Sequence, residues 1–165
     1  MSAAGAGEDP QDERSGAVRR RSCARLGAVQ ALYQLALNPG LEPVSVVGEF
    51  VHHRLGREID GEVYGEADEK LFGDLVRGIT ECRERLDETI SAALSEEWPL
   101  LRLQTILRLI LEAGAYELAH RPDIPPRVTL KEYVTIAHAF FDGKEPGLAN
   151  GVLHRLARVL RPAEL

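Results

Sequence analysis

The stretch WPLLRLQTILRLILEAGAYEL, from Trp98 to Leu118, decides the fold of this chain. From Leu103 onward its apolar residues recur at the three- and four-residue spacing of a helix: they are Leu103, Ile106, Leu107, Ile110, Leu111, Ala113, Gly114 and Leu118. The apolar arc is too wide for a helix that touches a single neighbour, and Arg108 and Glu112 fall on the opposite side. We therefore expect this helix to lie at the centre of the molecule, surrounded by others.

Glu117 projects into the middle of this apolar arc, between Tyr116 and Leu118. A carboxylate in such a place is tolerable only when it is hydrogen-bonded. It could be a catalytic acid, but a buried Glu more often ties down the end of a neighbouring helix. We interpret Glu117 as structural.

Further helices are expected on both sides of the central one. The first begins at Val18 and ends before Asn38-Pro39-Gly40, and a second covers Leu41 to Leu55. Asp68 is the expected N-cap of a third, and a fourth reaches Ser95; whether the chain breaks between them near Cys82 is left open.

After the central helix, two more are expected. Thr129 and Glu132 form the pattern of a capping box, and Pro146 suits the first turn of a last helix. No segment shows the period-two alternation of a strand. The expected class is all-α with about seven helices: an acidic disordered tail over residues 1–17 and a single helical domain over residues 18–165.

Composition excludes several classes of protein. The chain has 165 residues and 44% hydrophobic content, which suits one domain. No apolar run is long enough to cross a bilayer, and the N-terminus lacks the apolar core of a secretory signal. Cys23 and Cys82 stand alone and the five histidines are dispersed, so we expect a reducing cytoplasmic setting and no metal site.

Charge is unevenly distributed along the chain. The net charge is −6, yet the run Arg19, Arg20, Arg21 and Arg25 contains no acid, while the segment from Glu66 to Glu97 carries ten. This polarity would suit one anionic and one cationic partner.

Two stretches could bind nucleic acid. The first is RRRSCAR, because arginine-rich segments place guanidinium groups on phosphates and exposed bases. The second is GKEPGLANGVLHRLAR, from Gly143 to Arg158, where a helix start offers free N–H groups. A solvated helix start and ordinary cap chemistry are the respective alternatives. No catalytic motif such as GxSxG, a P-loop, GxGxxG or HExxH occurs, so no active site is expected.

Four blocks in order, RRRSCARLGAVQALYQ, RLQTILRLILEAGAYEL, DIPPRVTLKEYVTIAHAFF and GKEPGLANGVLHRLAR, resemble the signature blocks of the NusB family of bacterial transcription antitermination factors. The resemblance spans roughly Arg19 to Arg161. It implies an all-helical fold of two packed bundles and no enzymatic activity or cofactor. It also implies binding of boxA RNA from ribosomal RNA leader transcripts, together with the ribosomal protein NusE, in a complex with NusA, NusG and RNA polymerase.

The resemblance also implies site residues. Its RNA-binding residues fall on Arg19, Arg20, Arg21, Arg25, Gln30, Lys144, Leu148 and Asn150, and its partner-binding residues on Tyr33, Arg108 and Glu112. Three positions depart from the family pattern: Leu148 stands where relatives often have an aromatic residue, Glu112 where Arg is frequent, and Lys131 where Asn is usual. Leu148 cannot stack on a base, and stacking is worth about 1–3 kcal/mol.

The acidic segment suits a basic partner such as NusE, with a solvated helix face as the alternative. Some relatives self-associate, and whether this chain forms a homodimer is left open. Two other interpretations compete. One is a helical protein–protein module without RNA contact; the other is the NusB-like front domain of an RNA methyltransferase, disfavoured because the sequence contains no glycine-rich cofactor loop.

Overall fold

A computed structural model describes residues 10–53, 58–59, 62–63 and 67–165 of the chain. The helices of this described part are α1 (Pro10–Leu37), α2 (Pro43–His53), α3 (Glu69–Ala93), α4 (Thr105–His120), α5 (Pro126–Phe140) and α6 (Glu145–Leu160). Two 3₁₀ turns, η1 (Leu100–Arg102) and η2 (Pro162–Glu164), and two antiparallel two-residue strands, β1 (Glu58–Ile59) and β2 (Glu62–Val63), complete it. The predicted all-α class is confirmed, and the short strand pair is an addition that the sequence did not predict.

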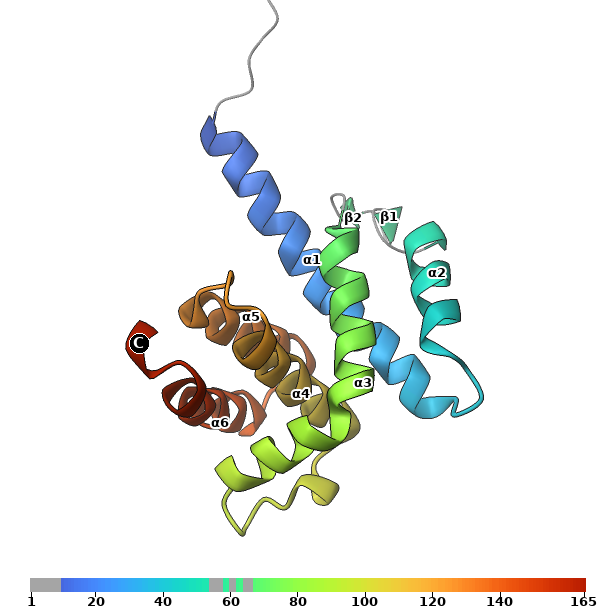
Figure 1. Cartoon of the computed structure of the whole chain (residues 1–165). Helices are drawn as coiled ribbons and strands as arrows, with labels where there is room; N and C mark the ends of the chain where they lie inside the picture. Colours follow the sequence, from blue (N-terminus) through green and yellow to red (C-terminus); the bar gives the residue numbers. More distant parts are fainter. Residues whose placement is uncertain (1–9, 54–57, 60–61, 64–66) are drawn as a thin grey trace, which may run out of the picture.

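Helix α4 is the centre of the fold, as its sequence predicts. Every residue from Leu109 to Leu118 is buried, and α4 packs against α1, α3, α5 and α6. Figure 1 shows α4, α5 and α6 gathered on one side and α1, α2 and α3 on the other, so the expected two bundles are present. None of the helices in the described ranges is both long and apolar enough to span a membrane.

The structure answers the question left open at Cys82, and it places the start of α1 earlier than expected. Helix α3 continues through Cys82 as one element that bends along its length in Figure 1, which reduces the expected seven helices to six among the described residues. Helix α1 begins at Pro10 rather than Val18. A proline in the first turn and the acids Asp12 and Glu13 close to the N-terminal end of the helix dipole favour this earlier start. Residues 10–17 of the expected tail are therefore helical, and residues 1–9 lie outside the described range.

The expected capping box at Thr129 is wrong. Helix α5 already begins at Pro126, and the buried hydroxyl of Thr129 donates a hydrogen bond to Glu117 (3.2 Å) instead of capping its own helix. The expected N-cap at Asp68 is confirmed, since its carboxylate accepts the Leu71 N–H at 3.0 Å. Pro146 stands in the first turn of α6 as predicted.

Close packing and one buried cation fix the bundles. A Cβ atom on Gly78 of α3 would lie 2.2 Å from the Tyr116 hydroxyl, so only glycine lets this ring cross α3. Arg161, after the last turn of α6, donates to the carbonyls of Arg121 (3.2 Å), Pro122 (3.3 Å) and Ile124 (2.9 Å). These bonds tie the end of α6 to the turn between α4 and α5, a role that the sequence did not reveal.

Candidate nucleic-acid interface

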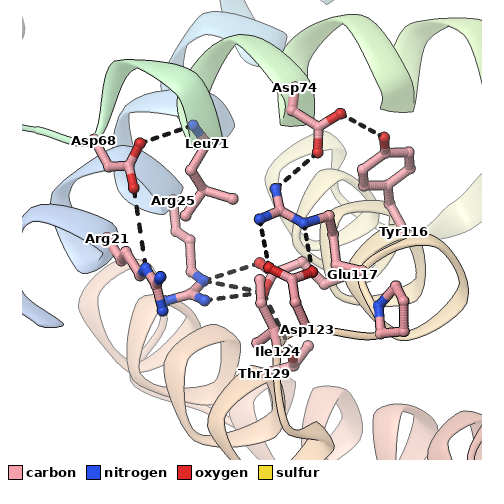
Figure 2. A network of polar contacts seen from close by, with 12 residues as sticks. Arg21, Arg25, Asp68, Leu71, Asp74, Tyr116, Glu117, Asp123, Ile124 and Thr129 are labelled. Carbon is pink, nitrogen blue, oxygen red and sulfur yellow. Dashed lines mark hydrogen bonds and ion pairs between the residues drawn. The ribbon is translucent and has the colours of Figure 1, made fainter. Parts of the chain in front are cut away.

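Arg19, Arg20 and Arg21 lie exposed on α1. Figure 1 shows the N-terminal end of this helix projecting from the body of the molecule. We call these three residues the arginine segment. The start of α3 holds the segment in place: the Asp68 N–H donates to the Arg20 carbonyl at 3.1 Å. In Figure 2 the Arg21 guanidinium points toward the Asp68 carboxylate, and the Nε–Oδ2 distance is 3.9 Å. The backbone is thus fixed while the cationic side chains remain accessible.

Ser22, the residue after the arginine segment, makes a second contact with the rest of the protein. The Ser22 hydroxyl donates to Oε1 of Glu132 on α5 at 2.8 Å, and the same carboxylate lies 3.8 Å from Arg25 Nη1. The arginine segment is therefore held from two sides, by α3 at Arg20 and Arg21 and by α5 at Ser22. A surface fixed in this way meets a ligand with little loss of backbone freedom.

Arg25 was expected to bind RNA, and this expectation is wrong. Its side chain is 1% exposed and forms three hydrogen bonds with the Glu117 carboxylate, at 2.9–3.2 Å (Figure 2). Thr129 and Tyr133 of α5 also donate to Glu117. Arg25 therefore joins α1 to α4 and α5 inside the protein, and the structural interpretation of Glu117 is confirmed.

The protonation states in this network follow from burial and charge. Burial opposes the charged form of Arg25, but the hydrogen bond and negative charge of Glu117 outweigh it and raise the pKa of Arg25. Burial and then the charge of Glu117 raise the pKa of Tyr133 well above its usual value of 10.0. Tyr133 consequently remains a hydrogen-bond donor to the carboxylate at physiological pH.

Gln30 and Tyr33, both predicted for an RNA or partner face, are exposed on the later part of α1. Tyr33 is accompanied by three further exposed apolar side chains on the end of α1, the following turn and the start of α2, namely Leu37, Leu41 and Val44. We call these four residues the α1–α2 apolar surface. The structure leaves all four side chains in contact with solvent.

The second predicted RNA stretch lies elsewhere on the molecule. Lys144 and Asn150 are exposed, while Leu148 is half-buried and packs against the core. Helix α5 meets this part of α1 at Glu132 and runs eight residues farther, about 12 Å, to Phe140 before the chain turns into α6. The arginine segment and the start of α6 are therefore not brought together by direct contact, and an extended ligand would be needed to reach both.

Glu112 and Arg108, predicted to bind a partner, face α3 instead of open solvent. The Glu112 side chain is 1% exposed and accepts a hydrogen bond from Arg83 at 2.8 Å. Burial raises the pKa of Glu112, although Arg83 opposes that shift. Arg108 is 30% exposed and lies 2.6 Å from Asp87. The prediction for Glu112 is wrong because α3 covers the polar side of α4, and only Arg108 keeps an accessible edge.

The acidic part of α3 divides into two sets. Asp87 is used internally by Arg108, whereas Glu81, Glu84 and Glu88 are exposed. Near the other end of this helix, Asp74 accepts hydrogen bonds from Tyr116 (2.9 Å) and Arg121 (3.0 Å), as Figure 2 shows. The chain therefore presents an anionic stretch on α3 and the cationic arginine segment on α1.

Comparisons with known proteins agree with this geometry. A sequence profile of the NusB family matches residues 22–158. The transcription antitermination protein NusB of Nitrobacter hamburgensis is 48% identical over 147 residues, which cover 89% of this chain and 91% of the relative. The protein of the same name from Sinorhizobium fredii is 45% identical over 152 residues, covering 92% of this chain and 94% of the relative.

Solved structures give the same result. The structure of T. maritima NusB superimposes with a TM-score of 0.67 at 30% identity, covering 86% of this chain and 90% of that one. A second structure, of the antitermination factors NusB and NusE in complex with double-stranded RNA, gives a TM-score of 0.70 at 25% identity, covering 86% and 98%.

Proposed function

The chain belongs to the NusB family, and from this membership we propose that it is an RNA-binding transcription antitermination factor. It would bind the boxA element of nascent ribosomal RNA leader transcripts as a heterodimer with NusE. The heterodimer would join NusA, NusG and RNA polymerase and let elongation pass terminators. Its role is that of a cytoplasmic adaptor and not of an enzyme.

The observation that carries the RNA part of the proposal is the exposed arginine segment. Arg19, Arg20 and Arg21 are accessible on a helix whose backbone is held by Asp68 and whose next residue is bonded to Glu132. Guanidinium groups form bidentate contacts with phosphate, and three consecutive arginines offer them on different sides of a fixed helix, so an RNA backbone that crosses this helix can be contacted. Lys144 and Asn150 would contact a more distant part of the same strand, and Gln30 would contact it farther along α1, nine residues after Arg21.

The proposed partner surface combines apolar contact with charge. The α1–α2 apolar surface, which includes Tyr33, offers side chains that would lose water on binding. The exposed acids of α3, Glu81, Glu84 and Glu88, would attract a basic protein such as NusE and raise its association rate. Arg108 contributes its accessible edge to this surface. Reversing the charge of the three acids together, with NusE binding measured against salt, tests the electrostatic part.

Binding of a labelled single-stranded boxA-type RNA tests the proposal, with and without purified NusE. We expect NusE to tighten RNA binding. In Arg20→Ala/Arg21→Ala we expect weaker binding and a slope of log K against log salt that is shallower by about 1.4, since each phosphate contact on a single strand contributes about 0.7. The matched control is Arg85→Ala/Arg102→Ala, which removes the same charge from exposed positions on α3 and η1.

Three outcomes separate the alternatives. Loss of binding in the first variant and not in the control supports the RNA site on α1. An unaffected affinity in both would move the site toward Lys144 and Asn150. Absence of RNA binding by the wild type under every condition would leave a helical protein–protein module without direct RNA contact.

A further inference from the structure

Asp68 uses its two carboxylate oxygens for different purposes. Oδ1 accepts the Leu71 N–H at 3.0 Å and so caps the start of α3. Oδ2 faces the Arg21 guanidinium at 3.9 Å. Figure 2 shows both contacts, with Asp68 placed between the first turn of α3 and the arginine segment. One side chain therefore belongs both to the helix cap and to the cationic surface.

The contact between Asp68 and Arg21 is loose enough to be exchanged. At 3.9 Å it is an ion pair without a hydrogen bond, and the side chains of Arg21 and Asp68 are 53% and 32% exposed. Exposed pairs of this kind contribute little to stability because water and salt screen them. Arg21 consequently keeps its N–H donors available for a stronger acceptor, such as a phosphate that takes two charge-assisted hydrogen bonds.

We propose that Asp68 controls the affinity of the arginine segment for RNA by competing with a phosphate for Arg21. This inference rests on the proposed function. In the free protein the Asp68 carboxylate partly neutralises Arg21, and an incoming phosphate must displace it. The cap is unaffected by this exchange because Oδ1 alone makes it, so α3 stays in place while Arg21 turns to the RNA.

The competition lowers the affinity of the arginine segment for every RNA backbone, and this can limit non-specific binding. Charge-driven binding is independent of sequence. An arginine that is already partly neutralised adds little to weak, non-specific encounters, and a ligand that also reaches other contacts, such as NusE or the start of α6, can still displace the carboxylate. Asp68 would thus restrain binding of the adaptor to RNA in the absence of its partner.

The chemistry of helix caps supplies a clean variant. Asn is as good an N-cap residue as Asp, so Asp68→Asn keeps the bond to Leu71 and removes only the competing charge. We expect this variant to bind a labelled boxA-type RNA about two- to fivefold more tightly at low salt, the range that corresponds to an exposed ion pair. The gain should shrink as salt rises.

A double-mutant cycle separates the role of Asp68 from a general change in charge. RNA binding is measured for wild type, Asp68→Asn, Arg21→Ala and the double variant. We expect the gain from Asp68→Asn to vanish when Arg21 is absent. The control Glu96→Gln makes the same change in net charge at an exposed position after the far end of α3, and should leave affinity unchanged.

Asp68→Ser, which also caps a helix, repeats the test should Asp68→Asn fold poorly, and thermal melts of both confirm that α3 is retained. If the wild type binds RNA and the Asp68 variants bind it no more tightly, the inference is overturned and the proposed function is left intact. The same holds if the gain in RNA affinity persists when Arg21 is absent. A wild type that binds no RNA, alone or with NusE, would overturn the proposed function and this inference with it.

Discussion

Because Arg25 and Glu117 form a buried ion pair, we expect the replacement of Glu117 by the amide glutamine to cause a large loss of stability. In Glu117→Gln the side chain keeps its volume, but only one oxygen remains for Thr129 and Tyr133, which donate to different carboxylate oxygens, and the negative charge is lost. The Arg25 guanidinium, 1% exposed, is then a buried cation whose nearest remaining carboxylate is Glu132, at 3.8 Å from Nη1. Water cannot solvate it without opening the contact between α1 and α5.

The magnitude follows from the burial of both partners. Removing one member of a fully buried ion pair typically costs about 3–5 kcal/mol, because the other charge is left uncompensated. Glu132 offsets part of this, so we expect a loss near the lower limit, about 3 kcal/mol. In a chain of this size that corresponds to a fall in Tm of roughly 6–12 °C.

Urea unfolding followed by circular dichroism measures this loss. The matched control is Glu84→Gln, the same chemical change at an exposed position of α3, for which we expect less than about 0.5 kcal/mol. The double variant Arg25→Met/Glu117→Gln removes the stranded cation and should be more stable than Glu117→Gln alone. A loss below about 1 kcal/mol in Glu117→Gln, or a double variant no better than the single one, would refute the reasoning.

Three further predictions follow from particular side chains. Burial raises the pKa of Tyr133 well above 10 and that of Tyr116 to about 12. The stability that depends on their protonated forms should therefore be complete below about pH 10 and fall as pH rises toward 12. Urea unfolding across this pH range measures the free energy of unfolding, and a flat profile would contradict the prediction. Leu148→Phe adds an aromatic ring at a half-buried position on α6. It should tighten single-stranded RNA binding at least about fivefold without changing the salt slope, which fluorescence anisotropy measures. Unchanged affinity would mean that RNA does not cross this helix. Gly78→Ala places a Cβ atom 2.2 Å from the Tyr116 hydroxyl and should destabilise the protein by about 1–3 kcal/mol. Gly48→Ala, whose Cβ atom has nothing within 4 Å, should stabilise it by about 0.5–1 kcal/mol. Thermal melts compare the two variants, and equal shifts in Tm would count against the packing argument.

The sequence predicted the helices and helix ends that are determined by residues a few positions apart. The apolar stripe from Leu103 to Leu118 identified the central helix, Asp68 identified the start of α3, and Pro146 that of α6, because periodicity and caps act within a few residues. The start of α1 was placed too late because composition, not helix-end chemistry, was used to judge residues 10–17. Thr129 matched a capping pattern by sequence, but its hydroxyl is bonded to Glu117, a residue on another helix.

Arg21 and Arg25 explain why the candidate site could be predicted only in part. They are four residues apart and so lie on nearly the same face of α1, yet one is 53% and the other 1% exposed in its side chain. The difference comes from what covers that face: α4 and α5 lie over Arg25, while Arg21 is approached only at its rim, by Asp68 before α3 and by the charge of Asp123 after α4. One signal for Arg25 was nevertheless present in the sequence, since it shares the phase of Val29 and Leu32, both of which are buried. An inward Arg on one helix and an inward Glu117 on another each need a buried partner of opposite charge, so the two helical patterns together are enough to predict the pair. The same run of arginines thus serves two purposes, with its last member anchoring the helix that presents the first three.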